Sequence, residues 1–463
     1  MRHHLSLTHG WLPAVVQAIA ATVLLVAILS PSLRRRLLRI SLAVLVGVGA
    51  AAWTRWYIDS QGLAGYPPPR SLLIWVALTG VALGMLLLGG RQGGWREHGV
   101  ALSAVPLCLL CAALALNQWV GYFPTVQTAW NQLTAGPLPD QTDQATVVAM
   151  QQTGTIPAKG TVVDVNIGDT ASNFKHRGEL VYLPPAWYAT NPPPPLPTVM
   201  MIGGEFNTPA DWMRAGNAIK TIDAFAAAHN GNAPVFVFVD PGGTFNNDTE
   251  CVNGVRGNSA DHLTKDVVPF MISNFHVSPN RANWGIVGWS MGGTCAVDLA
   301  VMHPDMFSAF EDIAGDLSPN SGTKEQTIAR LFNGNADAWA AFDPGTVIIR
   351  HGQYNGIAGW FAVNGGQQSQ PTVIPAGRGA TPSPGEQTAA ANTLCGLGTA
   401  NGIDCAVMAQ AGKHDWPFAA RAFSDALPWL AGQIHTPGVP EIGFPAPGAA
   451  TSPPAGALQA AGR

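Results

Sequence analysis

The chain has 463 residues, of which 11% are charged and 47% are hydrophobic, and its formal net charge at pH 7 is −4. This composition indicates a membrane-attached protein rather than a wholly water-soluble one. The slight negative charge, with no basic stripe after the first 120 residues, argues against a nucleic-acid-binding protein.

Four apolar runs occupy residues 1–123. Each approaches the roughly 20 residues that a helix needs to cross a bilayer. Pro31 and several arginines follow the first run, where a secretory signal peptide would have a cleavage site with small residues. We therefore expect four membrane-spanning helices, with two amphipathic hairpins as the alternative. The expected spans are about residues 11–30, 38–57, 71–90 and 99–119.

Basic residues in the loops predict the orientation of these helices. Arginines lie in the first and third loops, whereas the loop from Asp59 to Arg70 has little positive charge. Because positively charged loops stay in the cytoplasm, we expect the N-terminus and everything after residue 120 on the extracytoplasmic side of a multi-pass cell-membrane protein. The loop arginines are Arg34, Arg35, Arg36, Arg39, Arg91 and Arg96.

The rest of the chain is expected to form a connector, a domain and a tail. Residues 124–158 are polar and rich in turn formers, which is typical of a membrane-proximal connector. Residues 159–435 alternate between strand and helix patterns. Residues 436–463 are rich in proline, alanine and glycine without apolar periodicity, and we expect this tail to be disordered.

The pattern of residues 159–435 predicts an α/β fold. Alternating segments at 161–167 and 178–183 are expected to form a hairpin. Strand and helix alternation after it predicts a mostly parallel sheet with helices on both faces. Further strands are expected at 198–202, 234–239, 284–287, 347–350 and 403–408, with helices at 211–228, 260–275, 293–300, 386–397 and 419–430.

Residues 288–292 read Gly-Trp-Ser-Met-Gly between an apolar strand pattern and a helix of small residues. This arrangement is typical of the nucleophile elbow of α/β-hydrolases, where a strained turn holds a serine hydroxyl above the sheet. Gly288 and Gly292 are expected because a Cβ at either position would collide with neighbouring backbone. We predict that Ser290 is a nucleophile; a surface turn is the alternative.

A serine nucleophile needs a base, and in this fold the acid and the histidine follow the serine along the chain. His414, just after the last predicted strand, is the expected base. The acid orients the imidazole and stabilises its charged form. Glu386, at the start of a predicted helix, is favoured for this role. Asp404, within a strand, and Asp343 remain alternatives.

Two backbone N–H groups are needed to bind an oxyanion. We expect one from Met291, directly after the nucleophile, and the other from Glu205 in the glycine-containing loop at residues 203–206. A plain tight turn is the alternative for this loop. The aromatic residues that could line an acyl or aromatic pocket are Phe206, Trp212, Trp289 and Trp416.

The remaining cysteines and histidines give weaker predictions. Cys395 and Cys405 flank a glycine-rich turn and could form a disulfide in an oxidising compartment. Cys295 is expected to pack as a small hydrophobe, and Cys251 has no evident partner. Because no group has metal-ligand spacing, we expect no metal and no cofactor. The histidines expected to be structural or exposed are His262, His303 and His351.

Residues 160–432 resemble the esterase D-like family, which includes S-formylglutathione hydrolases, enterochelin esterases and mycobacterial mycolyltransferases. The family implies an α/β-hydrolase fold and an acyl-enzyme on serine, without specifying the substrate. The resemblance rests on Val181–Pro185, Gly203–Gly204, Gly288–Gly293, His303–Phe307 and Lys413–Trp416.

Similarity to the mycolyltransferase branch extends to the spacing of His414 and Trp416 and to a glutamate early in a helix, where Glu386 lies. That branch acts on lipid and trehalose esters outside the cytoplasmic membrane. Two features differ: Gly292 stands where that branch carries alanine, and four spans replace a cleaved signal peptide.

The patterns predict a membrane-anchored serine esterase that forms an acyl-enzyme, and the resemblance implies an actinobacterial cell envelope with lipid or glycolipid esters as substrates. An acyltransferase that passes the acyl group to a sugar or lipid hydroxyl uses the same intermediate and is the alternative. A non-catalytic envelope scaffold is a third hypothesis.

Overall fold

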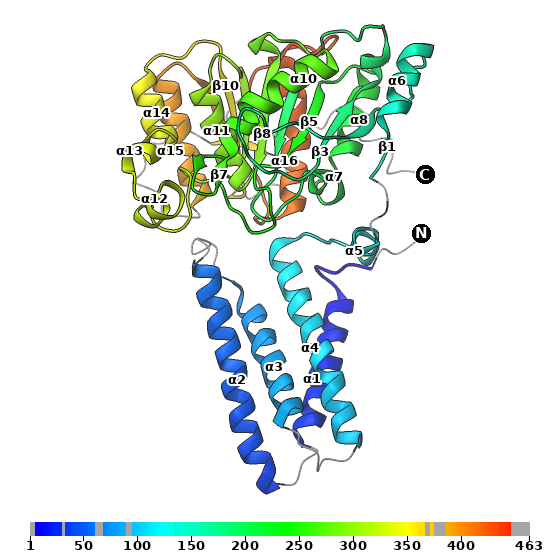
Figure 1. The fold of residues 1–463 in the computed structure, drawn as a ribbon, viewed down its shortest axis with the longest axis vertical. Coiled ribbons are helices and arrows are strands. Elements are labelled where there is room, and N and C mark those ends of the chain that lie inside the picture. The colour runs from blue at the N-terminus through cyan, green and yellow to red at the C-terminus, as the bar shows by residue number, and fades with distance from the viewer. Residues whose placement is uncertain are drawn as a thin grey trace. The chain divides into compact units, whose positions relative to one another are not determined.

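The computed structural model describes residues 5–29, 33–60, 68–88, 95–134, 136, 138–365, 371–374 and 386–445. The chain divides into two compact units, Met1–Gly136 and Pro137–Arg463 (Figure 1). Arg91, the side chains of Arg34, Arg35, Arg36 and Arg96, and residues 446–463 of the predicted tail lie outside this description.

The first unit consists of long apolar helices, each long and apolar enough to cross a membrane. Helix α2 packs on α3, α3 on α4, and α4 on α1. A backbone bridge between Ser6 and Thr125 brings the segment before α1 beside the segment after α4. The helices are α1 Trp11–Leu29, α2 Leu33–Ser60, α3 Arg70–Leu88 and α4 Trp95–Val120, followed by α5 Val126–Leu133.

Small residues bring α2 and α3 into close contact. A Cβ on Gly80 would lie 2.7 Å from Cα of Gly47, and a Cβ on Gly84 would lie 2.8 Å from Cα of Ala43. Such close approach is typical of helices in membranes, where small residues allow packing that the hydrophobic effect does not drive.

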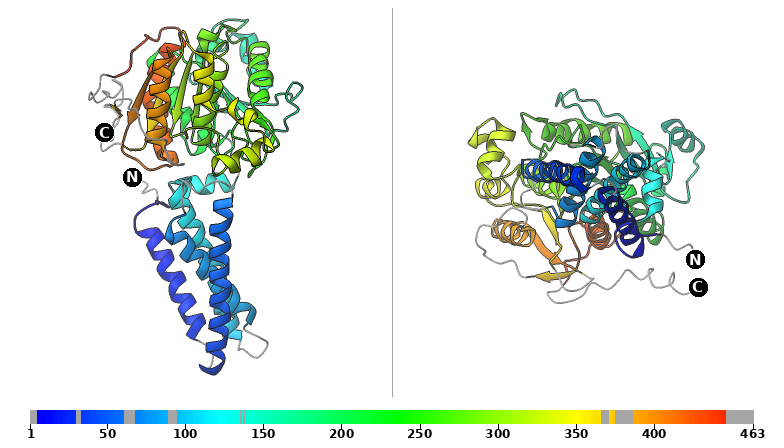
Figure 2. Two further views of the ribbon diagram at one scale, coloured as in Figure 1. Left: turned by 90° about the vertical axis from the view of Figure 1, so that its left-hand side faces the viewer. Right: turned by 90° about the horizontal axis from the view of Figure 1, so that it is seen from below.

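The second unit has the predicted α/β architecture, a mostly parallel sheet covered by helices (Figure 2). The described strands of this sheet have the order β1-β2-β3-β5-β4-β8-β9-β10-β12-β11, and β6 Asn253–Gly254 and β7 Gly257–Asn258 pair separately. The strands from β5 to β12 in this order pair in parallel, whereas β3 and the edge strand β11 pair antiparallel to their neighbours. The bounds are β1 Gln141–Thr142, β2 Thr161–Val165, β3 Glu179–Leu183, β4 Thr198–Ile202, β5 Val235–Val239, β8 Trp284–Trp289, β9 Ala309–Ile313, β10 Ala358–Val363, β11 Thr372–Ile374 and β12 Asp404–Ala409.

Side chains along each strand alternate between the two faces of the sheet, so apolar residues lie on both faces. Helices cover both of these faces. On β8, Gly285 faces Leu430 of α16, whereas Ile286 belongs to the core beneath α11. The helices are α6 Gln144–Thr153, α7 Asp211–Arg214, α8 Ala218–Ala228, α9 Ser259–Asp261, a π-helical turn His262–Val267, α10 Val268–Phe275, α11 Met291–Met302, α12 Lys324–Phe332, α13 Ala336–Ala340, α14 Pro344–His351, α15 Gln387–Ala400 and α16 Trp416–Gln433.

The strand predicted at 347–350 is wrong, because these residues belong to helix α14. Asp343 caps that helix by accepting a hydrogen bond from the N–H of Thr346 at 2.8 Å, and Pro344 occupies the first turn. Ile348 is buried and Ile349 is 65% exposed, as on an amphipathic helix. The strand of this region is β10.

Strand β9 was not predicted because it contains Glu311 and Asp312, both buried in the core. The helix expected at 211–228 is two helices, α7 and α8. They are separated at Gly216, where a Cβ would lie 2.9 Å from the ring of Trp416.

Two disulfides join elements of the second unit. The Cys395–Cys405 bridge, left open by the sequence, links α15 to β12. Cys251 and Cys295 form the other bridge, so the expectation that Cys295 packs as an unpaired hydrophobe is wrong. The two residues are 44 positions apart, and only the fold brings them together.

Described structure extends past both expected ends of the domain. Strand β1 and helix α6 lie in the segment expected to be a connector, and β1 pairs with β2. Residues 436–445, expected to be disordered, instead follow α16 with Thr436 buried and Phe444 stacked on Trp429 at 5.1 Å. The Phe444 ring also lies 6.1 Å from that of Trp360, so this segment packs against two buried indoles.

Candidate active site

Ser290 occupies the tight turn between β8 and α11. Its backbone has φ 58° and ψ −120°, a strained conformation that residues other than glycine rarely adopt. The N–H of Ser290 donates to the carbonyl of Ile313 in β9 at 2.9 Å, and the N–H of Gly293 donates to the carbonyl of Ser290 at 2.8 Å. The turn is the elbow that the sequence predicts.

Glycines are required on both sides of this turn. A Cβ on Gly288 would overlap the carbonyl oxygen of Gly292, and a Cβ on Gly292 would overlap the carbonyl oxygen of Ile202 at the end of β4. Larger residues at these positions would push α11 away from the sheet and displace the serine.

His414 lies in the loop between β12 and α16, and its side chain reaches the elbow. Its Nε2 atom is 2.9 Å from Oγ of Ser290, within hydrogen-bond reach for proton transfer. Burial lowers the pKa of His414 to about 4, so the imidazole is neutral at neutral pH and can accept the serine proton.

The three candidate acids occupy different places. Glu386 is the N-cap residue of α15, which runs back along the sheet from the carboxyl end of the preceding strands. Asp404 is the first residue of β12, at the opposite end of that strand from the His414 loop. The carboxylate of Asp343 accepts hydrogen bonds from N–H and Oγ1 of Thr346, at 2.8 and 2.5 Å, and thereby caps α14.

The loop after β4 lies directly against the nucleophile. A Cβ on Gly204 would lie 3.2 Å from both Cβ of Ser290 and the carbonyl oxygen of Trp289. The N–H of Asn207 donates to the carbonyl of Gly204 at 3.2 Å, which closes the loop into a turn. Glu205, the predicted second oxyanion donor, follows Gly204 directly.

The carboxyl group of Glu205 belongs to a buried charged cluster with Asp248 and Arg256. Burial and the Asp248 carboxylate raise the pKa of Glu205 well above its usual value, and the Arg256 guanidinium opposes them. Arg256 donates to Asp248 Oδ2 at 3.2 Å and to Ser321 Oγ at 3.2 Å. The sequence analysis used Glu205 only for its backbone N–H, whereas its side chain lies buried near these charges.

Arg177 and Asp240 hold the same loop from another side, and the sequence pattern did not indicate them. The Arg177 guanidinium pairs with the buried Asp240 carboxylate at 2.6 Å and donates to the carbonyl of Asn207 at 2.7 Å. Although burial opposes ionisation, the bonds and charge of Arg177 hold the pKa of Asp240 below its usual value. Only the pairing of β3 with β5 brings these two residues together.

Asp312 is a further buried acid beside the elbow that sequence reasoning missed. Its Oδ1 accepts a hydrogen bond from the N–H of Gly315 at 2.7 Å, and a Cβ on Gly293 would overlap the same oxygen. Burial raises the pKa of Asp312 to about 7. The sequence signal that could have revealed this residue is an aspartate within an otherwise apolar strand pattern.

The predicted pocket aromatics fall into two groups. Trp289 and Trp416 are 5% and 2% exposed, and the Trp289 ring lies 4.3 Å from the imidazole of His414, so both indoles pack behind the base. Phe206 is half-buried and lies 5.3 Å from Phe245, which is 70% exposed and was not predicted.

Residues 175–372 match the family described as "Putative esterase". This segment contains Ser290 and the loop after β4 but ends before Glu386 and His414. An uncharacterized protein of Corynebacterium glutamicum is 27% identical over 376 residues, which cover 78% of this chain and 85% of that protein.

Two solved structures have similar chains. An S-formylglutathione hydrolase from Agrobacterium tumefaciens is 16% identical with a TM-score of 0.47, covering 60% of this chain and 97% of that chain. MPT51 (FbpC1) of Mycobacterium tuberculosis is 18% identical with a TM-score of 0.38, covering 58% of this chain and 100% of that chain.

Proposed function

Residues 175–372 match the family described as "Putative esterase", and from this match we propose that Ser290 and His414 make the chain a serine carboxylic ester hydrolase. The observation that carries the proposal is the 2.9 Å separation of Ser290 Oγ and His414 Nε2 at a strained elbow. A nucleophile, a neutral base and a glycine loop against the nucleophile are the parts that acyl transfer to serine requires.

In the proposed reaction, Ser290 Oγ attacks the ester carbonyl carbon while its proton passes to Nε2 of His414. The N–H groups of Met291 and Glu205 bind the resulting oxyanion. The tetrahedral intermediate collapses, the alcohol leaves with the proton from His414, and the acyl group remains on Ser290. Water, activated by His414, then releases the acid and regenerates the serine.

We propose Glu386 as the acid that stabilises the imidazolium during these steps. An imidazole with a pKa of about 4 is a weak base, and a carboxylate beside it would favour its charged form as the proton arrives. The place of Glu386 at the start of α15, between the two last parallel strands, supports this role.

Lipid or glycolipid esters of the cell envelope are the proposed substrates. Four apolar helices suited to a bilayer support membrane anchoring, and the arginines of the first and third loops support an extracytoplasmic domain. Two disulfides in the second unit agree with an oxidising compartment. Phe206 and Phe245 offer apolar surface beside the proposed oxyanion loop for an acyl chain.

The test uses the full-length protein in detergent, a fluorophosphonate probe and p-nitrophenyl esters of increasing chain length. Mass spectrometry is expected to locate the adduct on Ser290, and Ser290→Ala and His414→Ala are each expected to lower kcat/KM by at least about 10⁴-fold. Ser273→Ala, at an exposed position of α10, is the control. Ester hydrolysis retained in Ser290→Ala would contradict the proposal.

The same acyl-enzyme could be passed to a hydroxyl acceptor instead of water. Adding trehalose or a glycolipid to the esterase assay distinguishes the two outcomes. An acylated acceptor would establish an acyltransferase, whereas free acid alone would leave hydrolysis as the reaction.

A further inference from the structure

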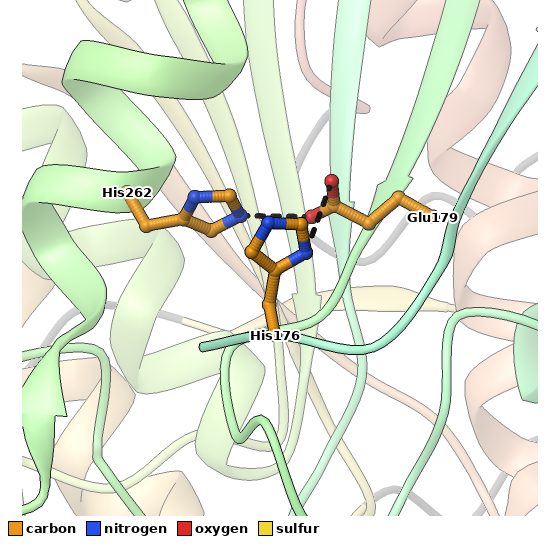
Figure 3. A group of neighbouring side chains, drawn as sticks. All are labelled: His176, Glu179 and His262. Atoms are coloured by element: carbon orange, nitrogen blue, oxygen red, sulfur yellow. Dashed lines mark hydrogen bonds and ion pairs between the residues drawn. The ribbon is translucent and has the colours of Figure 1, made fainter. Parts of the chain in front are cut away.

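We propose that His176, Glu179 and His262 form a buried structural site for a divalent transition metal, and that Zn²⁺ suits its ligands. Their ligand atoms all lie within 4.8 Å of one another. Figure 3 shows the Glu179 carboxylate beside a nitrogen of each imidazole. The three residues come from the loop before β3, the first residue of β3 and the start of the π-helical turn after α9.

The contacts of His176 cannot all be ordinary hydrogen bonds of a neutral ring. Its Nε2 lies 2.8 Å from the carbonyl oxygen of Ile167, and its Nδ1 lies 2.9 Å from the carbonyl oxygen of Arg177. Carbonyl oxygens only accept, and a neutral imidazole has a single N–H. If Nε2 donates its N–H to the carbonyl of Ile167, Nδ1 carries a lone pair that faces the Arg177 carbonyl oxygen and Glu179 Oε2. A cation bound between these three atoms would be attracted by the lone pairs of all of them.

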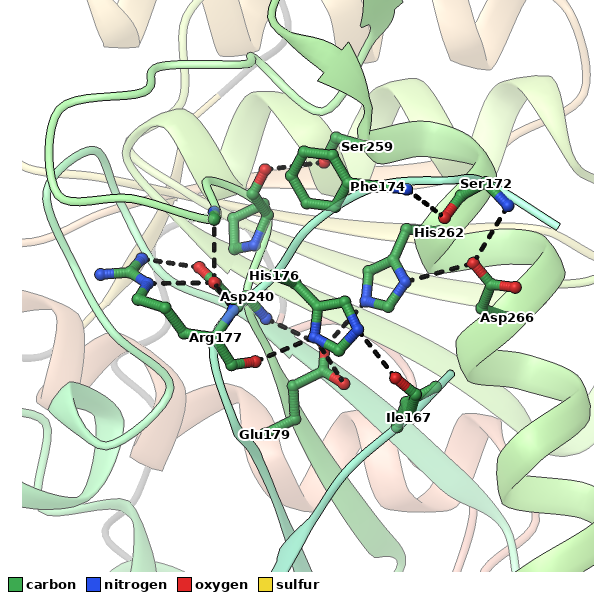
Figure 4. A network of polar contacts seen from close by, with 12 residues as sticks. Ile167, Ser172, Phe174, His176, Arg177, Glu179, Asp240, Ser259, His262 and Asp266 are labelled. Atoms are coloured by element: carbon green, nitrogen blue, oxygen red, sulfur yellow. Dashed lines mark hydrogen bonds and ion pairs between the residues drawn. The ribbon is translucent and has the colours of Figure 1, made fainter. Parts of the chain in front are cut away.

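His262 shows the same arrangement in a fully buried position. Its Nδ1 lies 3.4 Å from Asp266 Oδ2, and its Nε2 lies 3.0 Å from Glu179 Oε1 (Figure 4). Metal-binding histidines commonly donate one ring N–H to a carboxylate or carbonyl and direct the other nitrogen to the metal. In both rings the outer nitrogen has such an acceptor, Ile167 or Asp266, and the inner nitrogen faces Glu179.

Glu179 adds a buried oxygen atom that lacks a donor. Its Oε1 accepts a hydrogen bond from the N–H of Asp240 at 3.2 Å. Its Oε2 has no hydrogen-bond partner among the described residues, and the side chain is inaccessible to solvent. Buried carboxylate oxygens are rarely left unsatisfied, and a metal ion bound between Glu179 and the two rings would satisfy this one.

Three separations among the proposed ligand atoms lie near those of a four-ligand site. Ligand atoms about 2.0–2.1 Å from a tetrahedral Zn²⁺ lie about 3.3 Å from one another. The separations here are 3.0 Å between His262 Nε2 and Glu179 Oε1, 3.7 Å between His176 Nδ1 and Glu179 Oε2, and 2.9 Å between His176 Nδ1 and the Arg177 carbonyl oxygen. We take the Arg177 carbonyl oxygen as the fourth ligand; because it would close the set and Glu179 and His262 are buried, the proposed role is structural.

Protons on the two imidazole rings are the alternative to a metal ion at this site. If both rings carried two protons, the same contacts would become hydrogen bonds, with the charges balanced by Glu179 and Asp266. The rings, however, are stacked with centroids 4.1 Å apart, so two positive charges would lie face to face in the interior. One divalent ion replaces both protons and is shared by the two rings and Glu179.

The site would hold together segments that also support the oxyanion loop. Arg177, which supplies the carbonyl ligand, donates from its side chain to Asp240 and to the carbonyl of Asn207. Metal loss is therefore expected to lower stability strongly and to reduce turnover moderately, while Ser290 still reacts with the probe.

The experiment uses full-length protein in detergent, expressed without a polyhistidine tag and purified without chelators. Elemental analysis is expected to find about one Zn²⁺ per chain. Removal with a strong chelator is expected to lower Tm by several degrees, and added Zn²⁺ is expected to restore it. Reconstitution with Co²⁺ is expected to give the visible absorption of a four-coordinate ion.

Glu179→Gln and His262→Asn are expected to lose the metal, whereas His351→Ala, whose ring stacks on Tyr354, is expected to keep it. The wild-type chain decides the matter if these variants fail to fold. Less than about 0.1 metal ion per chain, with no response of Tm to Zn²⁺ after chelation, would overturn the proposal and assign the site to two protonated rings. Labelling of Ser290 in the same samples tests the esterase proposal separately.

Discussion

The two units of this chain use glycine for opposite purposes. In the first, Gly47, Gly80 and Gly84 lie along one contact and allow whole helices to approach. In the second, Gly288 and Gly292 serve a single turn, where a Cβ would overlap backbone oxygen atoms. A larger residue in the helix contact would therefore disturb one of several contacts between α2 and α3. A larger residue in the elbow would displace the atoms that hold Ser290.

The largest effect is expected at the elbow. Gly288→Ala would make a methyl group overlap the carbonyl oxygen of Gly292 and should lower kcat/KM by about 10³-fold, since a displacement of about 1 Å costs about 10² and overpacking adds to it. Gly396→Ala in α15, where a Cβ would meet nothing within 4 Å, is the matched control and should leave kcat/KM unchanged. Equal activity of the two variants would show that the elbow is as tolerant as the helices.

The next effect concerns the acid. Glu386→Gln is expected to lower kcat by about 10²-fold, because the imidazolium loses its stabilising charge. The Asp404→Asn control, at the far end of β12, should retain activity. If Asp404→Asn were the impaired variant, the carboxylate of β12 would be the acid after all.

The pH dependence of kcat/KM sharpens the same assignment. Burial favours neutral His414, so the active form persists below the usual histidine pKa of about 6.5 and is lost as pH falls toward about 4. Removal of a neighbouring carboxylate disfavours the charged ring and should move this acid limb still lower in Glu386→Gln. An unmoved limb would remove Glu386 from the triad.

A smaller effect is expected in the helical unit. Gly80→Leu should destabilise the contact between α2 and α3 by about 1–3 kcal/mol, measured by unfolding of the full-length protein in detergent. Gly49→Leu, where a Cβ would meet nothing within 4 Å, is the control. Probe labelling of Ser290 should stay normal in both; its loss in Gly80→Leu alone would show that the elbow depends on this helix contact.

The smallest effect is expected at the exposed aromatic pair. Phe245→Ala should raise KM several-fold for long-chain p-nitrophenyl esters and leave the acetate ester unchanged, because burying a phenyl ring against an acyl chain contributes about 1–2 kcal/mol. An equal change for both esters would assign Phe245 to loop packing instead.

Local signals in the sequence were sufficient for the elbow, the hairpin and most of the parallel strands. They failed at β9, where Glu311 and Asp312 interrupt an apolar pattern, and at α14, where β-branched residues outweighed the cap formed by Asp343 and Pro344. Both errors come from weighing side-chain composition above the contacts that the tertiary fold supplies.

Groupings of distant residues could not be predicted in the same way. Cys251 meets Cys295 of α11, and Glu205 lies near Asp248, only because the tertiary fold places these segments together. His262 lies 83 residues from Glu179, and no spacing rule connects them. In the folded protein, the antiparallel hairpin carries Glu179 and the π-helical turn carries His262, and the tertiary fold brings the two side chains together.

The bridge between Ser6 and Thr125 constrains any arrangement in which the apolar helices cross a bilayer. Backbone hydrogen bonds of 3.0 and 2.9 Å join Leu7 to Pro124 and Val126 to Leu5. A hydrocarbon core of about 30 Å could never separate atoms so close together. If these helices cross a bilayer, the number of crossings between the two segments must therefore be even, whichever side of the membrane the loops occupy.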